Sequence, residues 1–274
     1  MPCGYSFLDY DGLLKSKDEV IEITGNIMER EQFLKTKRLY HYTKFQSAVK
    51  ILDSMSLKFG SLDRMNDINE RYRPLYIPNS NDTEIESFSE EFYKQLSHVK
   101  QISLTRDIGK HYGFDIPAMW GHYAEMGEGV CFILDKKKIE KEAKLAKYIC
   151  SRVTYLDTHH DFILDTIPKD IPNYFYNQKK ELFFTKTKDW SYEQEFRILE
   201  LDACSKDSFL NIRNALIAIV LYDNSSQSVF GTTKYKLIKA ISFDIPILEY
   251  SNTNLWGTSL IDEDGNCNWI KEKE

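Results

Sequence analysis

The sequence is poor in glycine, proline and paired cysteines. Glycine occurs 12 times and proline 7 times in 274 residues, and no stretch rich in these residues or in serine divides the chain. We therefore expect no flexible linker between separate domains. The 5 cysteines are an odd number, and no two of them have the CxxC spacing of a zinc site. This usage predicts neither a disulfide framework nor a bound metal, and it favours a reducing, cytoplasmic compartment.

Segments for export or for membrane insertion are also lacking. No apolar run approaches the roughly 20 residues that cross a bilayer, and the first residues lack the basic region of a signal peptide. The net charge of -6 argues against a protein that coats nucleic acid, although a local basic patch could still meet a nucleic-acid substrate. The sequences G-x-S-x-G, H-E-x-x-H, G-x-G-x-x-G and the P-loop are absent, which removes the commonest hydrolase, metalloprotease and nucleotide-binding motifs.

What the sequence does contain is typical of a folded α+β protein. Hydrophobic residues make up 42% and aromatic residues 14% of the chain. Periodicity predicts strands near residues 38–43, 57–60, 101–105, 129–134, 149–156, 193–199, 215–222 and once or twice within 237–250. It predicts helices after Thr43, which can cap the first of them, and near 87–96, 118–126, 135–147 and 174–184. Because strands and helices alternate irregularly, we expect an α+β fold, with a helical extension at 1–37 and one domain at 38–274.

Two early segments carry polar groups among aromatic ones. The expected strand at 38–43 holds His41 between Tyr40 and Tyr42, an arrangement that suits a ligand ring or ribose hydroxyls and equally a histidine in the core. The segment 63–70 is rich in Asp, Asn and Glu. It lacks the alternating oxygen ligands and the central glycine of a calcium loop, so it is predicted to be a turn held by side-chain hydrogen bonds.

Two later segments combine carboxylates, aromatics and glycines. Trp120 and Tyr123 share one face of the expected helix at 118–126, in which Gly121 would let another group approach the backbone closely. In the strand predicted at 193–199, Glu193, Glu195 and Arg197 alternate and so point to one face. That face is either a solvent-exposed row of ion pairs or a site where a carboxylate stabilises a cation. Trp190, just before it, is expected to anchor the strand by burying its ring.

Taken in order, these segments resemble an uncharacterised bacterial family of domains of unknown function, DUF2971. The chain has L-Y-H-Y-T at 39–43, N-D-x-x-E at 66–70, S-L-T at 103–105, M-W-x-x-Y at 119–123 and K-x-x-x-W-x-x-E-x-E-F-R at 186–197. The family resemblance carries little biochemistry by itself.

A second resemblance is to ADP-ribosyltransferases of the poly(ADP-ribose)-polymerase-like and DNA-modifying toxin branches. It implies a mixed, mostly antiparallel split sheet with flanking helices. His41 and Thr43 match the first motif of that fold, Ser103 and Thr105 followed by Trp120 and Tyr123 fit the middle one, and Glu193 with Glu195 matches the last. The resemblance implies that Glu195 and Glu193 are catalytic. The NAD-binding residues it implies are His41, Tyr42, Thr43, Ser103, Thr105, Arg106, Trp120, Tyr123 and Arg197.

This likeness implies an NAD-consuming enzyme of the glycosyltransferase class that modifies a protein, DNA or RNA, with NAD as substrate and no metal. A bacterial toxin or antiphage defence effector with an antitoxin or another defence-system partner, and without a membrane, would fit it. An NAD glycohydrolase, with water as acceptor, and a non-catalytic sensing or scaffolding module are the alternatives. The lysine-rich helix expected at 135–147 either faces a nucleic-acid acceptor or is a solvated surface.

Overall fold

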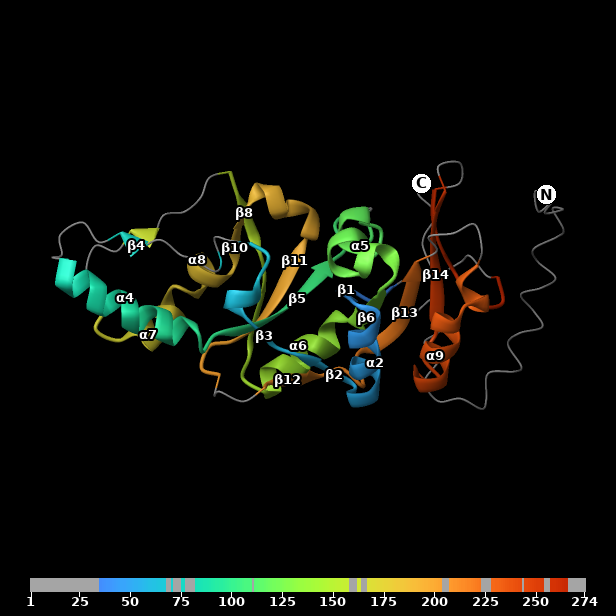
Figure 1. Cartoon of the computed structure of the whole chain (residues 1–274), viewed down its shortest axis with the longest axis horizontal. Coiled ribbons are helices and arrows are strands. Elements are labelled where there is room, and N and C mark those ends of the chain that lie inside the picture. The colour runs from blue at the N-terminus through green and yellow to red at the C-terminus, as the bar shows by residue number, and fades with distance from the viewer. Residues whose placement is uncertain are drawn as a thin grey trace.

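The protein is described by a computed structural model that covers residues 35–67, 70, 75–76, 82–109, 111–157, 162–163, 167–203, 207–222, 228–242, 244–253 and 257–265. It has an α+β architecture built on one large, mostly antiparallel sheet with helices on both of its faces and beyond one edge (Figure 1). The predicted fold class is therefore confirmed at that level. The extension expected at 1–37 lies outside the described residues except for its last three positions.

The strands of the large sheet run in the order β15-β14-β13-β6-β1-β5-β11-β7, and β3 pairs with β5 as a ninth strand. Their bounds are β1 Arg38–Thr43, β3 Gly60–Ser61, β5 Lys100–Arg106, β6 Val130–Asp135, β7 Ile149–Arg152, β11 Glu195–Glu200, β13 Leu216–Tyr222, β14 Ile247–Thr253 and β15 Gly257–Ile261. Three small ribbons complete the β-structure. They pair β2 (Ser56–Lys58) with β12 (Phe209–Asn211), β4 (Leu75–Tyr76) with β9 (Phe162–Ile163), and β8 (Thr154–Leu156) with β10 (Thr185–Thr187).

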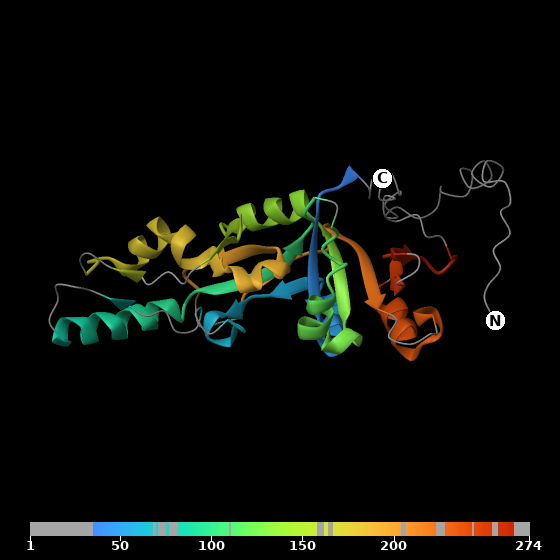
Figure 2. The same cartoon turned by 90° about the horizontal axis from the view of Figure 1, so that it is seen from above.

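The helices divide between the two faces of the sheet and one end. They are α2 Phe45–Ser54, α4 Asp82–Leu96, α5 Pro117–Tyr123, α6 Lys136–Leu145, α7 Ile171–Asn177, α8 Lys179–Phe183 and α9 Thr233–Ser242. Apolar residues of α2, α6 and α9 pack on the face that carries Leu39, Phe132 and Ile198. Residues of α5 pack on the opposite face, against Tyr40 and Tyr42. Helices α4, α7 and α8 enclose a separate core at the far end of the molecule (Figures 1 and 2).

The sheet opens between β1 and β5. Strand β1 pairs with β6 along six positions, and β5 pairs with β11 along six, but β1 and β5 are in register only at Leu39–Arg106 and Tyr40–Thr105. Beyond Tyr40 the two strands diverge. On its β5 side, the second half of β1 therefore has no neighbouring strand, although it remains paired with β6 on the other side. This gap determines where the candidate site lies.

Several predicted elements differ from the structure. The strand predicted at 149–156 is two strands, β7 and β8, and the helix predicted at 174–184 is two helices, α7 and α8. The segment expected to supply strands at 237–250 begins as helix α9, and β14 starts only at Ile247. Helix α5 stops at Tyr123, because Glu125 and Met126 both have positive φ. Thr43 does not cap α2. Lys44 precedes that helix, and the free backbone N–H of Phe45 donates instead to a carboxylate oxygen of Glu125 at 2.9 Å. A cap supplied from 80 residues away is invisible to local sequence analysis.

Candidate functional site

The opening between β1 and β5 contains a pocket of about 380 Å³. Its walls come from β1, β5, α5, residues 64–66 and Glu70, and further charged residues come from β10, from the 3-10 helix Lys188–Glu193 and from β11. The predicted site residues that line it are His41, Tyr42, Ser103, Thr105, Tyr123, Glu193 and Glu195. Residues far apart in sequence thus converge on one cavity, as expected of a ligand site.

The pocket floor is a buried network of five charged side chains. Arg197 is fully buried and binds Glu195 in a two-pronged contact, with Nε 2.6 Å from Oε1 and Nη2 2.8 Å from Oε2. Arg197 also pairs with Glu70. Lys186 Nζ lies 2.8 Å from Glu193, 3.1 Å from Glu195 and 3.8 Å from Glu70. Three carboxylates therefore share two cations, which leaves one excess negative charge if all five groups are ionised.

Glu195 is ionised at neutral pH despite its burial. Burial alone raises the pKa of this carboxyl, but the charges of Arg197 and Lys186, with a hydrogen bond from Ser103, bring its pKa down to about 2. The same carboxylates raise the pKa of Lys186 and of Arg197 and overcome the opposite effect of burial on each. Glu195 is therefore a fixed negative charge at the base of the pocket.

Glu193 has a different environment. Burial raises the pKa of its carboxyl, and the neighbouring charge of Glu195 adds to this, while Lys186 opposes it. Its two oxygens are held separately, because Tyr123 donates its hydroxyl to one and Lys186 its ammonium to the other. Two carboxylates with pKa values moved in opposite directions are the usual basis for dividing the work of charge stabilisation and proton transfer.

The local backbone explains how both glutamates reach the same pocket. Glu195 and Arg197 alternate on β11 and so share one face of the sheet, as the sequence predicts. Their register partners on β5 are Thr105 and Ser103. Glu193 is not on that strand, contrary to our expectation. It ends a 3-10 helix, and Gln194 follows with a positive φ of 50°, which turns the chain into β11. The interpretation of a solvent-exposed row is also wrong, since Glu193, Glu195 and Arg197 are all buried.

His41 reaches the pocket because the sheet is open beside it. Alternation along β1 directs His41 to the side opposite Tyr40, whose register partner is Thr105. Because no strand pairs with His41 on the β5 side, His41 is open to the cavity and lines it. Burial lowers the pKa of its imidazole to about 4, so the ring is neutral at pH 7. Its Nδ1 is buried without a hydrogen-bond partner, which a ligand hydroxyl could supply.

Four of the predicted binding residues do not line the pocket: Thr43, Arg106, Trp120 and Arg197. The Trp120 indole donates to the backbone oxygen of Phe114 and stacks on Tyr250, so it belongs to the core. Arg197 lies beneath the floor. Tyr42 contributes to the lining, but its side chain is largely buried: its hydroxyl donates to the backbone oxygen of Gly113 and its ring packs at right angles to that of Trp120.

The expected roles of Trp190 and Gly121 also change. Trp190 is only half-buried, and its ring lies 5.1 Å from the Lys186 ammonium, so it covers the ion-pair network and not a hydrophobic core. A Cβ added at Gly121 would meet no atom within 4 Å among those described, so no group approaches the backbone there. Gly129 packs against the carbonyl of Thr43 and does not line the pocket.

Sequence reasoning missed Glu70 and Lys186 as parts of the site. Both lie inside the patterns that the family resemblance uses, as the glutamate of N-D-x-x-E and the lysine of K-x-x-x-W. The sequence predicts that Glu70 belongs to a polar turn, and it indicates no role for Lys186. The charge pattern does not reveal that Glu70 meets Lys186 and Arg197, because Glu70 lies more than 100 residues before both of them.

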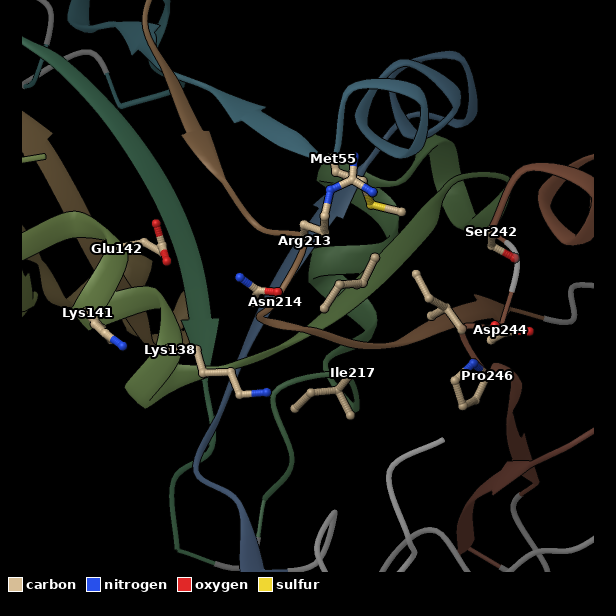
Figure 3. A pocket seen from close by; sticks show the side chains of 12 residues that line it. Met55, Lys138, Lys141, Glu142, Arg213, Asn214, Ile217, Ser242, Asp244 and Pro246 are labelled. Atoms are coloured by element: carbon tan, nitrogen blue, oxygen red, sulfur yellow. The ribbon is translucent and has the colours of Figure 1, made fainter. Parts of the chain in front are cut away.

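A second cavity of about 620 Å³ lies between α6, the β12–β13 connection and the start of β14. Figure 3 shows that its cations do not converge: Arg213 lies beside Met55, whereas Lys138 and Lys141 lie on the other side of the cavity. Glu142 and Asp244 also line it. It lacks a buried network like the one beneath the first pocket, so we place the candidate site between β1 and β5.

Comparison with known proteins identifies part of the chain. Residues 119–198 match the model of a family described as "Protein of unknown function (DUF2971)". The match identifies this stretch, from α5 to β11, as a DUF2971 family domain, and it includes Tyr123, Lys186, Glu193 and Glu195. No curated protein and no solved structure matches the chain.

The described ranges contain neither a helix that could span a membrane nor a cluster of metal ligands. None of the helices described is both long and apolar enough to cross a membrane. Within the same ranges, no group of three or more His, Cys, Asp or Glu side chains has an arrangement that could hold a metal ion.

Proposed function

We propose that the pocket between β1 and β5 binds NAD, and that the protein transfers ADP-ribose from it to a macromolecule as a toxin or defence effector with an ADP-ribosyltransferase-like fold. The observation that carries the proposal is the meeting of His41, Ser103 and Glu195 in one cavity where the sheet opens. The motif resemblance requires these residues to converge. His41 and Glu195 are 154 positions apart in the sequence, so residues chosen by motif alone would rarely meet in one cavity by chance.

The proposed reaction breaks the bond between the nicotinamide nitrogen and ribose C1′. The bonding electron pair leaves with nicotinamide, which becomes neutral, and positive charge develops on C1′ and the ring oxygen of the ribose. The ionised Glu195 carboxylate stabilises that charge, and the buried Arg197 holds it in a fixed orientation. His41, being neutral, exchanges a hydrogen bond with a ribose hydroxyl.

Glu193 serves the acceptor. An oxygen or nitrogen of the acceptor attacks C1′ and gives up its proton to the Glu193 carboxylate, so that ADP-ribosylated acceptor, nicotinamide and one proton are produced. The raised pKa of Glu193 suits it to this base role better than that of an ordinary surface glutamate. Tyr123, which donates to Glu193, orients the carboxylate.

The test is release of free nicotinamide from NAD by the purified protein. We expect Glu195→Gln to lower the turnover rate by about 100-fold or more with little change in NAD affinity, because the substitution removes only the charge. Glu90→Gln is the matched control, since it makes the same change on the exposed surface of α4. Circular dichroism of all variants checks that the fold is retained. Undiminished release by folded Glu195→Gln would exclude this mechanism.

Labelled NAD incubated with separate protein, DNA and RNA pools identifies the acceptor. Label on one pool, lost in Glu193→Gln while nicotinamide release persists, supports transfer. Release without label on any pool means that water is the acceptor and the protein is an NAD glycohydrolase. No release at all by the wild-type protein would favour a non-catalytic module, in which the charge network serves the fold alone.

A further inference from the structure

Charge is distributed unequally between the floor and the mouth of the pocket. The carboxylates of Glu70, Glu193 and Glu195 at the floor have side chains no more than 5% exposed. Three further cations line the same cavity, namely Lys44, Lys58 and Arg64, and all three are exposed. A ligand in this pocket therefore meets excess negative charge at its inner end and positive charge at its outer end.

The rim cations come from three separate elements. Lys44 follows the last residue of β1, Lys58 ends β2, and Arg64 ends the 3-10 helix at Leu62–Arg64. Lys58 forms an ion pair with Asp207 at 2.8 Å, with both side chains more than half exposed. That pair is open to solvent and weak, so an incoming anion can compete for the lysine. Neither Asp207 nor Glu125, whose carboxylate lies near Lys44, lines the pocket, so the exposed charged residues that do line it are positive.

Arg106 and Arg197, the two arginines that the resemblance implies in NAD binding, are not placed to bind a diphosphate in this pocket. Arg197 is fully buried and its charge is committed to Glu195 and Glu70. Arg106 does not line the pocket. Lys186 also lines the pocket, but its charge is committed to three carboxylates, so the cations left for the phosphate groups of a ligand are those at the rim.

We propose that Lys44, Lys58 and Arg64 bind the diphosphate of the substrate, and that this rim with the carboxylate floor orients a ligand carrying opposite charges at its two ends. The inference rests on the proposed function, since NAD is such a ligand: its nicotinamide ring is cationic and its diphosphate is anionic. The rim attracts the diphosphate by charge and hydrogen bonding, while the excess negative floor favours the cationic ring. These three side chains are positioning residues and take no part in the chemical step.

The test measures binding separately from catalysis. Lys44→Gln, Lys58→Gln and Arg64→Gln are made singly and together, with Lys50→Gln on α2 as the matched control, because Lys50 is exposed and does not line the pocket. The probes are ADP-ribose, which retains the diphosphate but lacks nicotinamide, and inorganic pyrophosphate. Since hydrogen bonds to charged groups contribute about 1.5–3 kcal/mol, the ADP-ribose Kd should rise about tenfold for at least one single variant and further in the triple variant. Lys50→Gln should leave it unchanged.

The outcomes separate this inference from the proposed function. A raised KM for NAD with an unchanged kcat, together with weaker ADP-ribose binding, supports the rim. Wild-type nicotinamide release combined with equal ADP-ribose binding by the wild-type and triple variants overturns the rim and leaves the proposed function standing. ADP-ribose binding that depends on the rim, without any nicotinamide release, supports the rim and contradicts the reaction. A wild-type protein that binds neither probe contradicts both.

Discussion

At the scale of single residues, Lys186 holds the site together. Its ammonium contacts all three carboxylates of the network, and no other side chain described does so. Removing one partner of a buried ion pair is much more destabilising than removing an exposed one, because the remaining charges stay buried without compensation. The network thus has to be tested as a unit, not residue by residue.

Lys186→Met should lower the free energy of unfolding by about 3–5 kcal/mol at pH 7. Adding Glu193→Gln should restore part of this loss, because the double variant again has one excess negative charge. Denaturant unfolding of the wild type, both single variants and the double variant gives the coupling energy. Additive effects of the two substitutions would show that Lys186 and Glu193 do not interact energetically.

The same variants test how the free energy of unfolding depends on pH. The folded-state pKa of Lys186 lies above its ordinary value, so its stabilising contribution is present below about pH 10.4 and is lost as the pH rises through the folded-state value. Glu195 has a lowered pKa, so its contribution is present above about pH 4.3 and is lost as the pH falls toward 2. Unfolding free energies measured from pH 3 to pH 11 should fall more steeply above pH 10 in the wild type than in Lys186→Met, where buried tyrosines with a raised pKa, such as Tyr40 and Tyr42, still cause some alkaline loss.

At the scale of elements, the turn between α5 and β6 fixes the position of Tyr123 relative to β1. Residues Glu125 and Met126 have positive φ, and Gly129 lies so close to β1 that an added Cβ would stand 2.3 Å from the Thr43 carbonyl and 2.7 Å from the Ala124 Cα. Both neighbours are backbone atoms, which cannot give way as a flexible side chain can. Close backbone contact here therefore requires glycine.

Gly129→Ala should destabilise the protein by about 1–3 kcal/mol through overpacking. Gly121→Ala is the natural control, because its added Cβ meets nothing within 4 Å in the described structure and the residue lies within α5. It should leave stability unchanged or raise it by up to about 1 kcal/mol, since alanine favours helix. Melting temperatures of the two variants check the contrast, and equal effects would mean that the turn is not tightly packed.

At the scale of the whole molecule, the opening between β1 and β5 can be compared with the second cavity beside α6 as a binding site. If NAD binds in the opening between β1 and β5, ADP-ribose at 100 times its Kd should raise the free energy of unfolding by about 2.7 kcal/mol. Lys44→Glu should diminish the shift at the same ligand concentration, whereas Lys138→Glu, an equal charge reversal at the second cavity, should preserve it. The reverse pattern in a thermal-shift experiment would place the ligand in the second cavity.

The α+β class and most strands follow from the sequence because alternation is a local property. Arg38–Thr43, Lys100–Arg106 and Leu216–Tyr222 lie within a residue or two of their predicted bounds. The segment that became α9 was mistaken for strand, since its apolar residues Leu237, Ile238 and Ile241 suit either structure in so short a run. Glu195 and Arg197 share a face for the same local reason that makes strands predictable.

Only the tertiary structure decided what those residues meet. The sequence indicated that His41, Ser103 and Glu195 belong to one site, but not that β1 and β5 separate after Tyr40, which is what lets His41 line the pocket. It also did not show that Glu70 and Lys186 complete the charge network or that Trp120 belongs to the core. The physical reason is that periodicity reports which side of an element a residue takes, whereas burial and charge pairing depend on which distant element packs there.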